Sequence, residues 1–69
     1  MNPIKKARLK KEMTMKELAT LIGVKTSQIS NIENDYNYPS AITLLKLMMI
    51  LDLKASELYK HYYITKKLH

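Results

Sequence analysis

Cysteine, phenylalanine and tryptophan are absent from this 69-residue chain, and glycine occurs once and proline twice. Without cysteine the chain has neither a disulfide framework nor a thiolate zinc site, and His61 and His69 cannot make a metal centre alone. We therefore expect no metal and no cofactor. So few glycines and prolines, with Leu, Ile and Met to fill the core, indicate several short helices rather than a β-rich fold.

Acidic residues are also scarce: there are 6, against 12 lysines and arginines, and the formal net charge is +6. This excess favours an anionic partner. A hydrophobic content of 46% argues against disorder. Since a chain of this size buries only about 60% of its unfolded surface, we expect one small domain over residues 1–69, with a flexible tail at residues 65–69.

No hydrophobic run is long enough to cross a bilayer, which takes about 20 apolar residues. The most apolar stretch, residues 41–53, is interrupted by Thr43 and Lys46. The basic N-terminus leads into no apolar segment of a secretory signal, so we expect a cytoplasmic protein without a membrane partner. Nor does the sequence contain a catalytic pairing, an acidic metal cluster or a glycine-rich phosphate loop, and we expect no enzyme.

Hydrophobic periodicity predicts five helices, at about residues 3–12, 15–22, 26–34, 41–53 and 56–64. Thr14 and Glu17 have the spacing of a capping box at the start of the second helix. Gly23 follows that helix, where a left-handed residue closes a helix and turns the chain. Ser40 is expected to cap the fourth helix. The sequence therefore predicts an all-α domain.

The second helix, its glycine turn and the third helix, together about residues 15–34, have the order of a helix-turn-helix. In that motif one helix crosses the DNA backbone and the next enters the major groove. The third helix carries short, uncharged side chains that donate and accept hydrogen bonds, at Thr26, Ser27, Gln28 and Asn31. The alternative is an ordinary solvated helix face.

An ordered series of residues resembles a known family. The series is Leu18-Ala19-x-x-Ile22-Gly23-Val24-x-x-x-x-Ile29-Ser30-x-Ile32-Glu33, followed by Pro39-Ser40 and Leu44-Leu45-Lys46-Leu47. Over about residues 4–58 the chain is similar to the lambda-repressor/Cro-like (XRE-type) helix-turn-helix proteins. The resemblance implies a compact five-helix domain that binds double-stranded DNA as a homodimer on a two-fold operator. It also implies regulation of transcription, which we expect to be repression.

The resemblance further implies roles for single residues. Base-reading positions fall on Thr26, Ser27 and Asn31, with Gln28 and Lys25 at the margins, and we assign Lys25 to the DNA backbone. Thr14 and Asn34 match phosphate-contact positions. Arg8 and Glu33 match an Arg and a Glu that join the first helix to the end of the third. A guanidinium binds a carboxylate bidentately, and both residues lie on the inward sides of their helices.

The chain departs from the family pattern at three positions. Met15 stands where relatives often have a Gln that contacts the backbone, so we expect one contact to be lost. Lys25 replaces a Ser or Thr cap, so Thr26 or Ser27 is expected to cap the third helix instead.

The third departure is Asp35, in place of a Gly, which puts a negative charge close to the phosphate path. Neutral hydrogen bonds from Tyr36, Asn37 and Tyr38 are expected to compensate for it.

The helix expected at residues 41–53 has two apolar stripes. The core stripe consists of Ala41, Leu44, Leu47, Met48 and Leu51. Beside it a second stripe of Ile42, Leu45 and Met49, with Tyr59, Tyr62 and Tyr63 further on, suggests a dimer interface. The alternative is that the C-terminal helix buries this second stripe.

Two other functions remain open. An antitoxin or accessory protein would use the apolar C-terminal surface to bind a different protein. A peripheral membrane protein would insert the first helix, but Ile4, Ala7 and Leu9 provide too little apolar area for a good anchor. His61 is expected to be a packing or surface residue without a function of its own.

Overall fold

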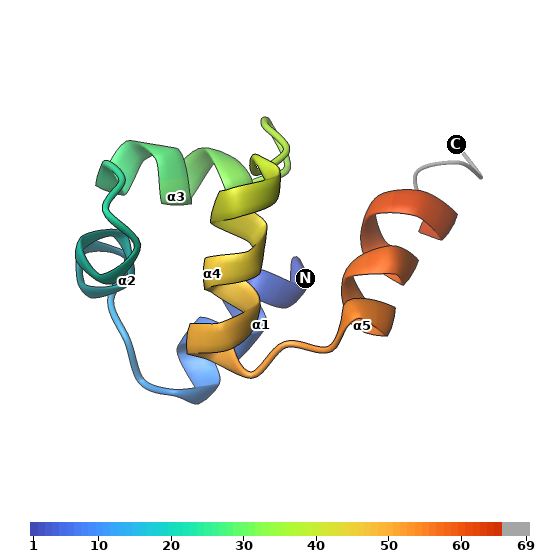
Figure 1. Cartoon of the computed structure of the whole chain (residues 1–69), viewed down its shortest axis with the longest axis horizontal. Coiled ribbons are helices and arrows are strands. Elements are labelled where there is room, and N and C mark those ends of the chain that lie inside the picture. The colour runs from blue at the N-terminus through green and yellow to red at the C-terminus, as the bar shows by residue number, and fades with distance from the viewer. Residues whose placement is uncertain (66–69) are drawn as a thin grey trace.

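The computed structural model describes residues 1–65, which are helical with no strand among them (Figure 1). The helices are α1 (Pro3–Lys10), α2 (Met15–Ile22), α3 (Thr26–Glu33), α4 (Ala41–Leu51), α5 (Ala55–Tyr59) and the π-helix η1 (Lys60–Thr65), which continues α5. The predicted all-α fold with five helices is confirmed. The expected flexible tail at residues 65–69 lies outside the described residues, apart from the backbone of Thr65.

Side-chain caps begin three of these helices. Thr14 and Glu17 form the predicted capping box: the Thr14 hydroxyl accepts from the Glu17 amide at 3.0 Å, and the Glu17 carboxylate accepts from the Thr14 amide at 2.9 Å. These bonds from Thr14 hold the pKa of Glu17 below its usual value. Ser40 caps α4 as predicted, accepting from the Thr43 amide at 3.2 Å. Asn2, for which no cap was predicted, caps α1 by accepting from the Ile4 amide at 2.7 Å.

Four helix ends differ from the prediction. α1 ends at Lys10 rather than at about residue 12, and Glu12 takes a positive φ of 56°. α3 ends at Glu33, with Asn34 as its C-cap, and Asp35 follows with a φ of 60°. α4 ends at Leu51 because Asp52 adopts φ 54° and turns the chain away. The last helix starts at Ala55, and its second half is a π-helix.

At the centre of the core lie the largest fully buried side chains, one from each of the first four helices: Ile4, Leu18, Ile29 and Leu47. Burying such a side chain contributes about 1.5–3 kcal/mol relative to leaving it exposed. Leu58 of α5 completes this core. The five helices therefore share a single apolar centre.

Only part of the predicted core stripe of α4 lies inside. Leu47 and Leu51 are buried, Leu44 and Met48 are half-buried, and Ala41 is exposed. The prediction for Ala41 is therefore wrong, because it is the first residue of α4 and its side chain stays exposed.

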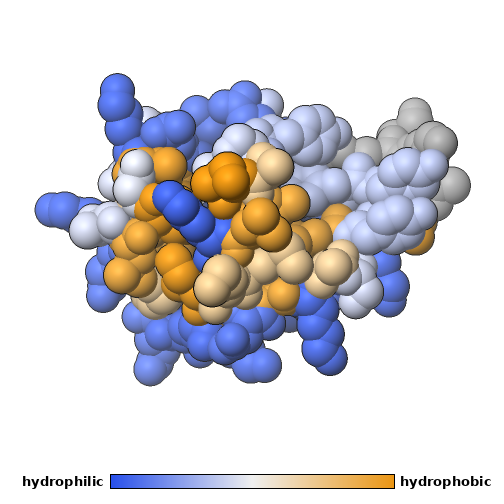
Figure 2. All heavy atoms as spheres, in the orientation of Figure 1, coloured by the Kyte–Doolittle hydropathy of each residue, from blue (hydrophilic) through white to orange (hydrophobic). Residues whose placement is uncertain are grey.

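The second stripe of α4 is not covered by the C-terminal helix, so that alternative is wrong. Ile42 is 63% exposed, Leu45 56% and Met49 81%. Figure 2 shows apolar side chains gathered over α4, with the polar aromatic residues of the C-terminal helix beside them. Tyr59 and Tyr63 stack there with ring centroids 4.9 Å apart. We call these five residues, Ile42, Leu45, Met49, Tyr59 and Tyr63, the α4–α5 surface.

A groove runs between the two halves of the α4–α5 surface. It has a volume of about 290 Å³ and is lined by Leu44, Met48, Ala55, Leu58, Tyr59, Tyr62 and Tyr63. Its lining is almost wholly apolar, so it extends the exposed apolar side chains of α4 into a concave strip.

Lys46 interrupts the apolar face of α4, and its charge has a structural use. Its Nζ donates to the carbonyl oxygen of Ile22 at 3.1 Å, at the C-terminal end of α2. Carbonyls in a last helical turn lack intrahelical partners, and a cation is favourable there. Lys46 therefore attaches α4 to the end of α2.

Within the described residues, no helix combines the length and the apolar character that crossing a bilayer requires. The same residues contain no group of three or more His, Asp or Glu side chains arranged to hold a metal ion.

Tyr62, which the sequence places at the dimer interface, is half-buried and connects η1 to the rest of the molecule. Its ring packs against the core and against the Tyr38 ring, with centroids 5.4 Å apart. Burial raises the pKa of Tyr62 against an opposing effect of the nearby Asn2 side chain, and no partner of the buried hydroxyl satisfies hydrogen-bond geometry. A buried hydroxyl that lacks a partner costs free energy.

Replacing Tyr62 by phenylalanine should therefore leave the domain as stable, or stabilise it by about 1 kcal/mol, because the ring stays and only the unsatisfied hydroxyl is removed. Thermal and urea unfolding of both proteins would measure this. Tyr62→Leu is the control for ring packing and should destabilise. A Tyr62→Phe variant that unfolds much more easily would mean that the hydroxyl has a strong partner.

Candidate nucleic-acid interface

α2 and α3 pack closely through buried apolar residues, with Leu18 and Ile22 on one helix and Ile29 on the other. Gly23 has a φ of 85° and ends α2, and its amide donates to the Ala19 carbonyl at 2.8 Å. A left-handed residue here turns the chain within a short distance, which brings α3 across α2. The two helices therefore form one packed unit, with α3 along its outer edge (Figure 1).

The first turn of α3 presents Thr26, Ser27 and Gln28 to solvent, whereas Asn31 is half-buried one turn later. The oxygen of the Gln28 side chain accepts from the Lys25 amide at 2.9 Å. The expectation that Thr26 or Ser27 caps this helix is therefore wrong, since Gln28 reaches back and satisfies that amide. The Gln28 NH₂ group adds two further donors on the same face.

The predicted backbone-contact residues lie around this face. Lys25 precedes α3 and is exposed, and Thr14 is exposed at the start of α2. Asn34 ends α3, and its side-chain NH₂ donates to the Ser30 carbonyl at 2.9 Å. Tyr36, 77% exposed, and Asn37 follow in the loop.

This loop folds back over the end of α3. The amides of Tyr36 and Asn37 both donate to the Asn31 carbonyl, at 2.9 and 3.3 Å. The structure thus brings the residues of α3 and the loop together, while Thr14 stands apart at the beginning of α2.

A hollow of about 460 Å³ opens beside α3. It is lined by Val24, Gln28, Ile32, Asn37, Tyr38, Pro39, Ser40 and Thr43. It therefore lies between α3, the loop and the first turn of α4. Its lining is rich in hydrogen-bonding side chains and contains no acidic residue.

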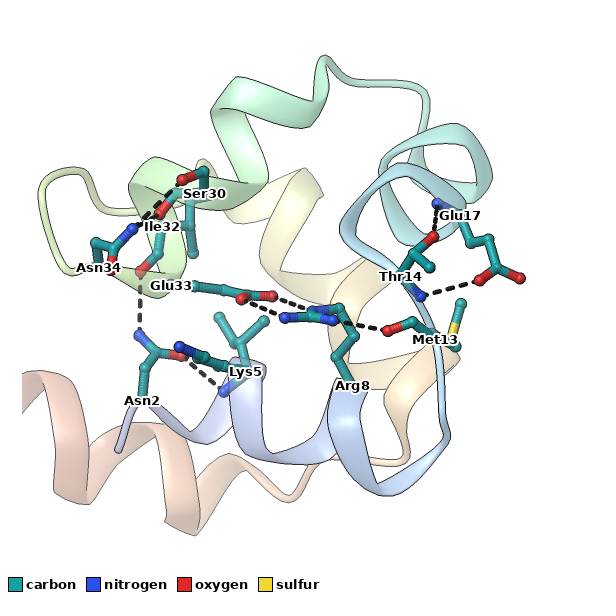
Figure 3. Close-up of polar contacts among 11 residues, drawn as sticks. Asn2, Lys5, Arg8, Met13, Thr14, Glu17, Ser30, Ile32, Glu33 and Asn34 are labelled. Atoms are coloured by element: carbon teal, nitrogen blue, oxygen red, sulfur yellow. Dashed lines mark hydrogen bonds and ion pairs between the residues drawn. The ribbon is translucent and has the colours of Figure 1, made fainter.

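Arg8 and Glu33 form a bidentate ion pair in the interior (Figure 3). Arg8 Nε donates to Glu33 Oε2 at 2.7 Å, and Nη2 donates to Oε1 at 3.0 Å. Nη1 donates to the Met13 carbonyl at 2.7 Å. Hydrogen bonding to Glu33 raises the pKa of Arg8, so this side chain stays charged. One guanidinium thus connects α1, the end of α3 and the segment before α2.

Asn2 supports the same end of α3 from the N-terminus. Its Nδ2 donates to the Ile32 carbonyl at 3.0 Å (Figure 3) and to Asp35 Oδ1 at 3.0 Å. The capping role had a signal in the sequence, because an Asn directly before a Pro marks a helix start. The long-range hydrogen bonds of Asn2 had no such signal in the sequence.

His61 also has a partner that the sequence did not suggest. Its Nε2 lies 2.7 Å from Asp35 Oδ1. Twenty-six positions separate the two residues, so no local pattern could have indicated the contact. η1 is therefore attached to the loop that follows α3.

Comparison with protein families returns the helix-turn-helix family, whose profile matches residues 4–58. Neither the curated proteins nor the solved structures returned a match. The matched region runs from α1 into α5 and includes the α2–turn–α3 unit with the polar outer face of α3. This is the region in which the sequence resembles the lambda-repressor/Cro-like proteins. The chain belongs to the helix-turn-helix family of DNA-binding regulatory domains.

Proposed function

We propose that this domain is a sequence-specific transcriptional repressor that binds double-stranded DNA as a homodimer on a two-fold operator. The observation that carries the proposal is the outer face of α3. It presents short side chains that both donate and accept hydrogen bonds, on a helix that Arg8 and Asn2 hold at its far end. Such a helix fits the major groove and can distinguish base pairs there.

In this proposal Thr26, Ser27, Gln28 and Asn31 read base edges. Thr14, Lys25, Asn34, Tyr36 and Asn37 contact the sugar-phosphate backbone on either side. The hollow beside α3 ends at the first turn of α4, where Ser40 starts the helix. Amide groups at a helix start favour a phosphate, so one DNA strand can follow this hollow.

Repression requires nothing beyond this interface. A protein that occupies an operator excludes other proteins from the same DNA, and occupancy depends on affinity and concentration alone.

The α4–α5 surface supports the homodimer. It carries three strongly exposed apolar side chains and a stacked tyrosine pair, next to an apolar groove. In such a dimer we expect the two α3 helices to lie about 34 Å apart, one turn along the same side of the duplex. A contiguous apolar surface of this kind marks a protein contact.

The same surface supports one other candidate, an antitoxin or accessory function in which a different protein binds it. The two candidates predict different oligomeric states for the isolated protein. A dimer in solution favours the repressor, and a monomer favours the accessory protein.

Selection of bound duplexes from a random DNA pool tests the proposal. We expect a consensus of two inverted half-sites with centres one helical turn, about 10 base pairs, apart. Enrichment of a single half-site would contradict the homodimer. No enrichment over the starting pool would contradict sequence-specific binding.

Asn31 and Lys25 should differ in what they contribute. Asn31→Ala should lose about 1–3 kcal/mol at one base pair of each half-site and relax the preference there, because an amide can bind an adenine edge through two hydrogen bonds. Lys25→Ala should weaken binding to all sequences nearly equally and lower the salt slope by about 1, because an ammonium at the helix entrance meets a phosphate.

The measurement is a titration of each variant against the matched operator and singly substituted operators, at several salt concentrations. Thermal unfolding provides the control, since the Asn31 side chain is half-buried. If Asn31→Ala weakens all operators uniformly while Lys25→Ala changes the preferred base, the two roles are reversed.

A further inference from the structure

The loop after α3 is joined to the C-terminal helix at both of its ends. Asp35 opens the loop and lies 2.7 Å from His61, and Tyr38 packs its ring against Tyr62. His61 and Tyr62 are neighbours on η1 and also contact each other edge to face, with ring centroids 4.9 Å apart. Two adjacent residues of η1 thus hold a loop that is far from them in sequence.

The negative charge of Asp35 is unfavourable for DNA binding at this position. Its carboxylate comes directly after α3, one position before Tyr36, which we assign to the DNA backbone. A negative charge near phosphates weakens binding, since phosphate contacts dominate the affinity of DNA-binding proteins. The structure holds this carboxylate from two sides, because Oδ1 lies 3.0 Å from Asn2 Nδ2 as well as 2.7 Å from His61 Nε2.

We propose that His61 is a positioning residue for DNA binding: it holds the Asp35 carboxylate toward the protein and away from the phosphate backbone. The Asp35 side chain is 32% exposed and that of His61 is 21% exposed, so the contact is partly open to solvent and water competes for it. Without His61, the carboxylate loses its 2.7 Å contact with Nε2, and we expect it to turn toward the DNA.

The proposal has a second consequence. η1 carries Tyr63 of the α4–α5 surface as well as His61 and Tyr62. A partner that docks on the α4–α5 surface therefore contacts the same helix that holds the loop.

A double-mutant cycle tests the proposal, which rests on the proposed DNA-binding function. The four proteins are wild type, His61→Ala, Asp35→Asn and the double variant, titrated against the selected operator. Asparagine suits position 35, because it tolerates the positive φ there and keeps an oxygen for Asn2 while losing the charge. We expect His61→Ala to weaken binding about threefold to tenfold when Asp35 is present, and less than twofold when residue 35 is Asn.

The exposed pair Lys11–Asp52 supplies a matched control. It joins a cation to an aspartate at 2.9 Å, at the opposite end of α4 from the loop. The same cycle with Lys11→Ala and Asp52→Asn should show no such coupling. If His61→Ala unfolds at the assay temperature, His61→Phe replaces it, because phenylalanine keeps the edge contact with Tyr62 and removes the nitrogen donor. The expected coupling is the same.

An equal effect of the His61 substitution in both backgrounds would overturn the inference while leaving DNA binding intact. Failure of the wild-type protein to bind any duplex would instead overturn the proposed function. A merely structural role for His61 would lower the melting temperature and would leave this coupling absent.

Discussion

Arg8→Ala should destabilise the domain by roughly 3–5 kcal/mol, because removing one partner of a buried ion pair leaves the other charge buried and unpaired. The side chains of Arg8 and Glu33 are only 8% and 3% exposed. The substitution also removes the bond to the Met13 carbonyl. Since small domains have only about 5–15 kcal/mol of stability in total, much of the Arg8→Ala protein should be unfolded at moderate temperature.

Urea and thermal unfolding measure this loss, and the double variant Arg8→Met with Glu33→Leu is the control. Both charges are absent from it, and apolar residues that replace a buried pair often preserve stability. It should therefore recover most of the loss. An unchanged melting temperature for Arg8→Ala would contradict the role of the pair in the fold.

Met49→Lys should give a folded monomer whose affinity for the full operator falls by about 10²–10⁴-fold, because two linked half-sites become two independent ones. Met49 is 81% exposed, so a lysine there fits without disturbing the core. Each copy would then present a charged side chain to the apolar surface of its partner. Ile42→Asp should have the same effect from the other end of α4.

Sedimentation measures whether Met49→Lys is a monomer. Titrations against full and single half-site duplexes measure whether the loss of affinity comes from the loss of the dimer. Binding to a single half-site should stay unchanged, which shows that α3 is intact. Leu9→Lys is the matched control, because it adds the same charge at an exposed apolar position of α1, outside the α4–α5 surface. An unaltered dimer in Met49→Lys would remove Met49 from the interface, and a monomeric wild-type protein would favour the accessory function.

The amino-acid sequence by itself determined the local structure of this protein. The capping box of Thr14 and Glu17, the turn at Gly23 and the cap at Ser40 use partners no more than four residues away, so a pattern can reveal them. The same holds for the polar face of α3, because helical spacing alone brings its residues together. These local features also carry the resemblance to the family that the match over residues 4–58 bears out.

Only the tertiary structure decided which polar side chains make long-range contacts. Asn2, Lys46 and His61 each bind a partner between 24 and 33 positions away. Helical periodicity separated the stripe of Leu47 from that of Ile42 and Met49, but only tertiary packing decided that the C-terminal helix leaves Ile42 and Met49 exposed. Such contacts depend on the angles and distances between packed helices, which no periodicity within one helix contains.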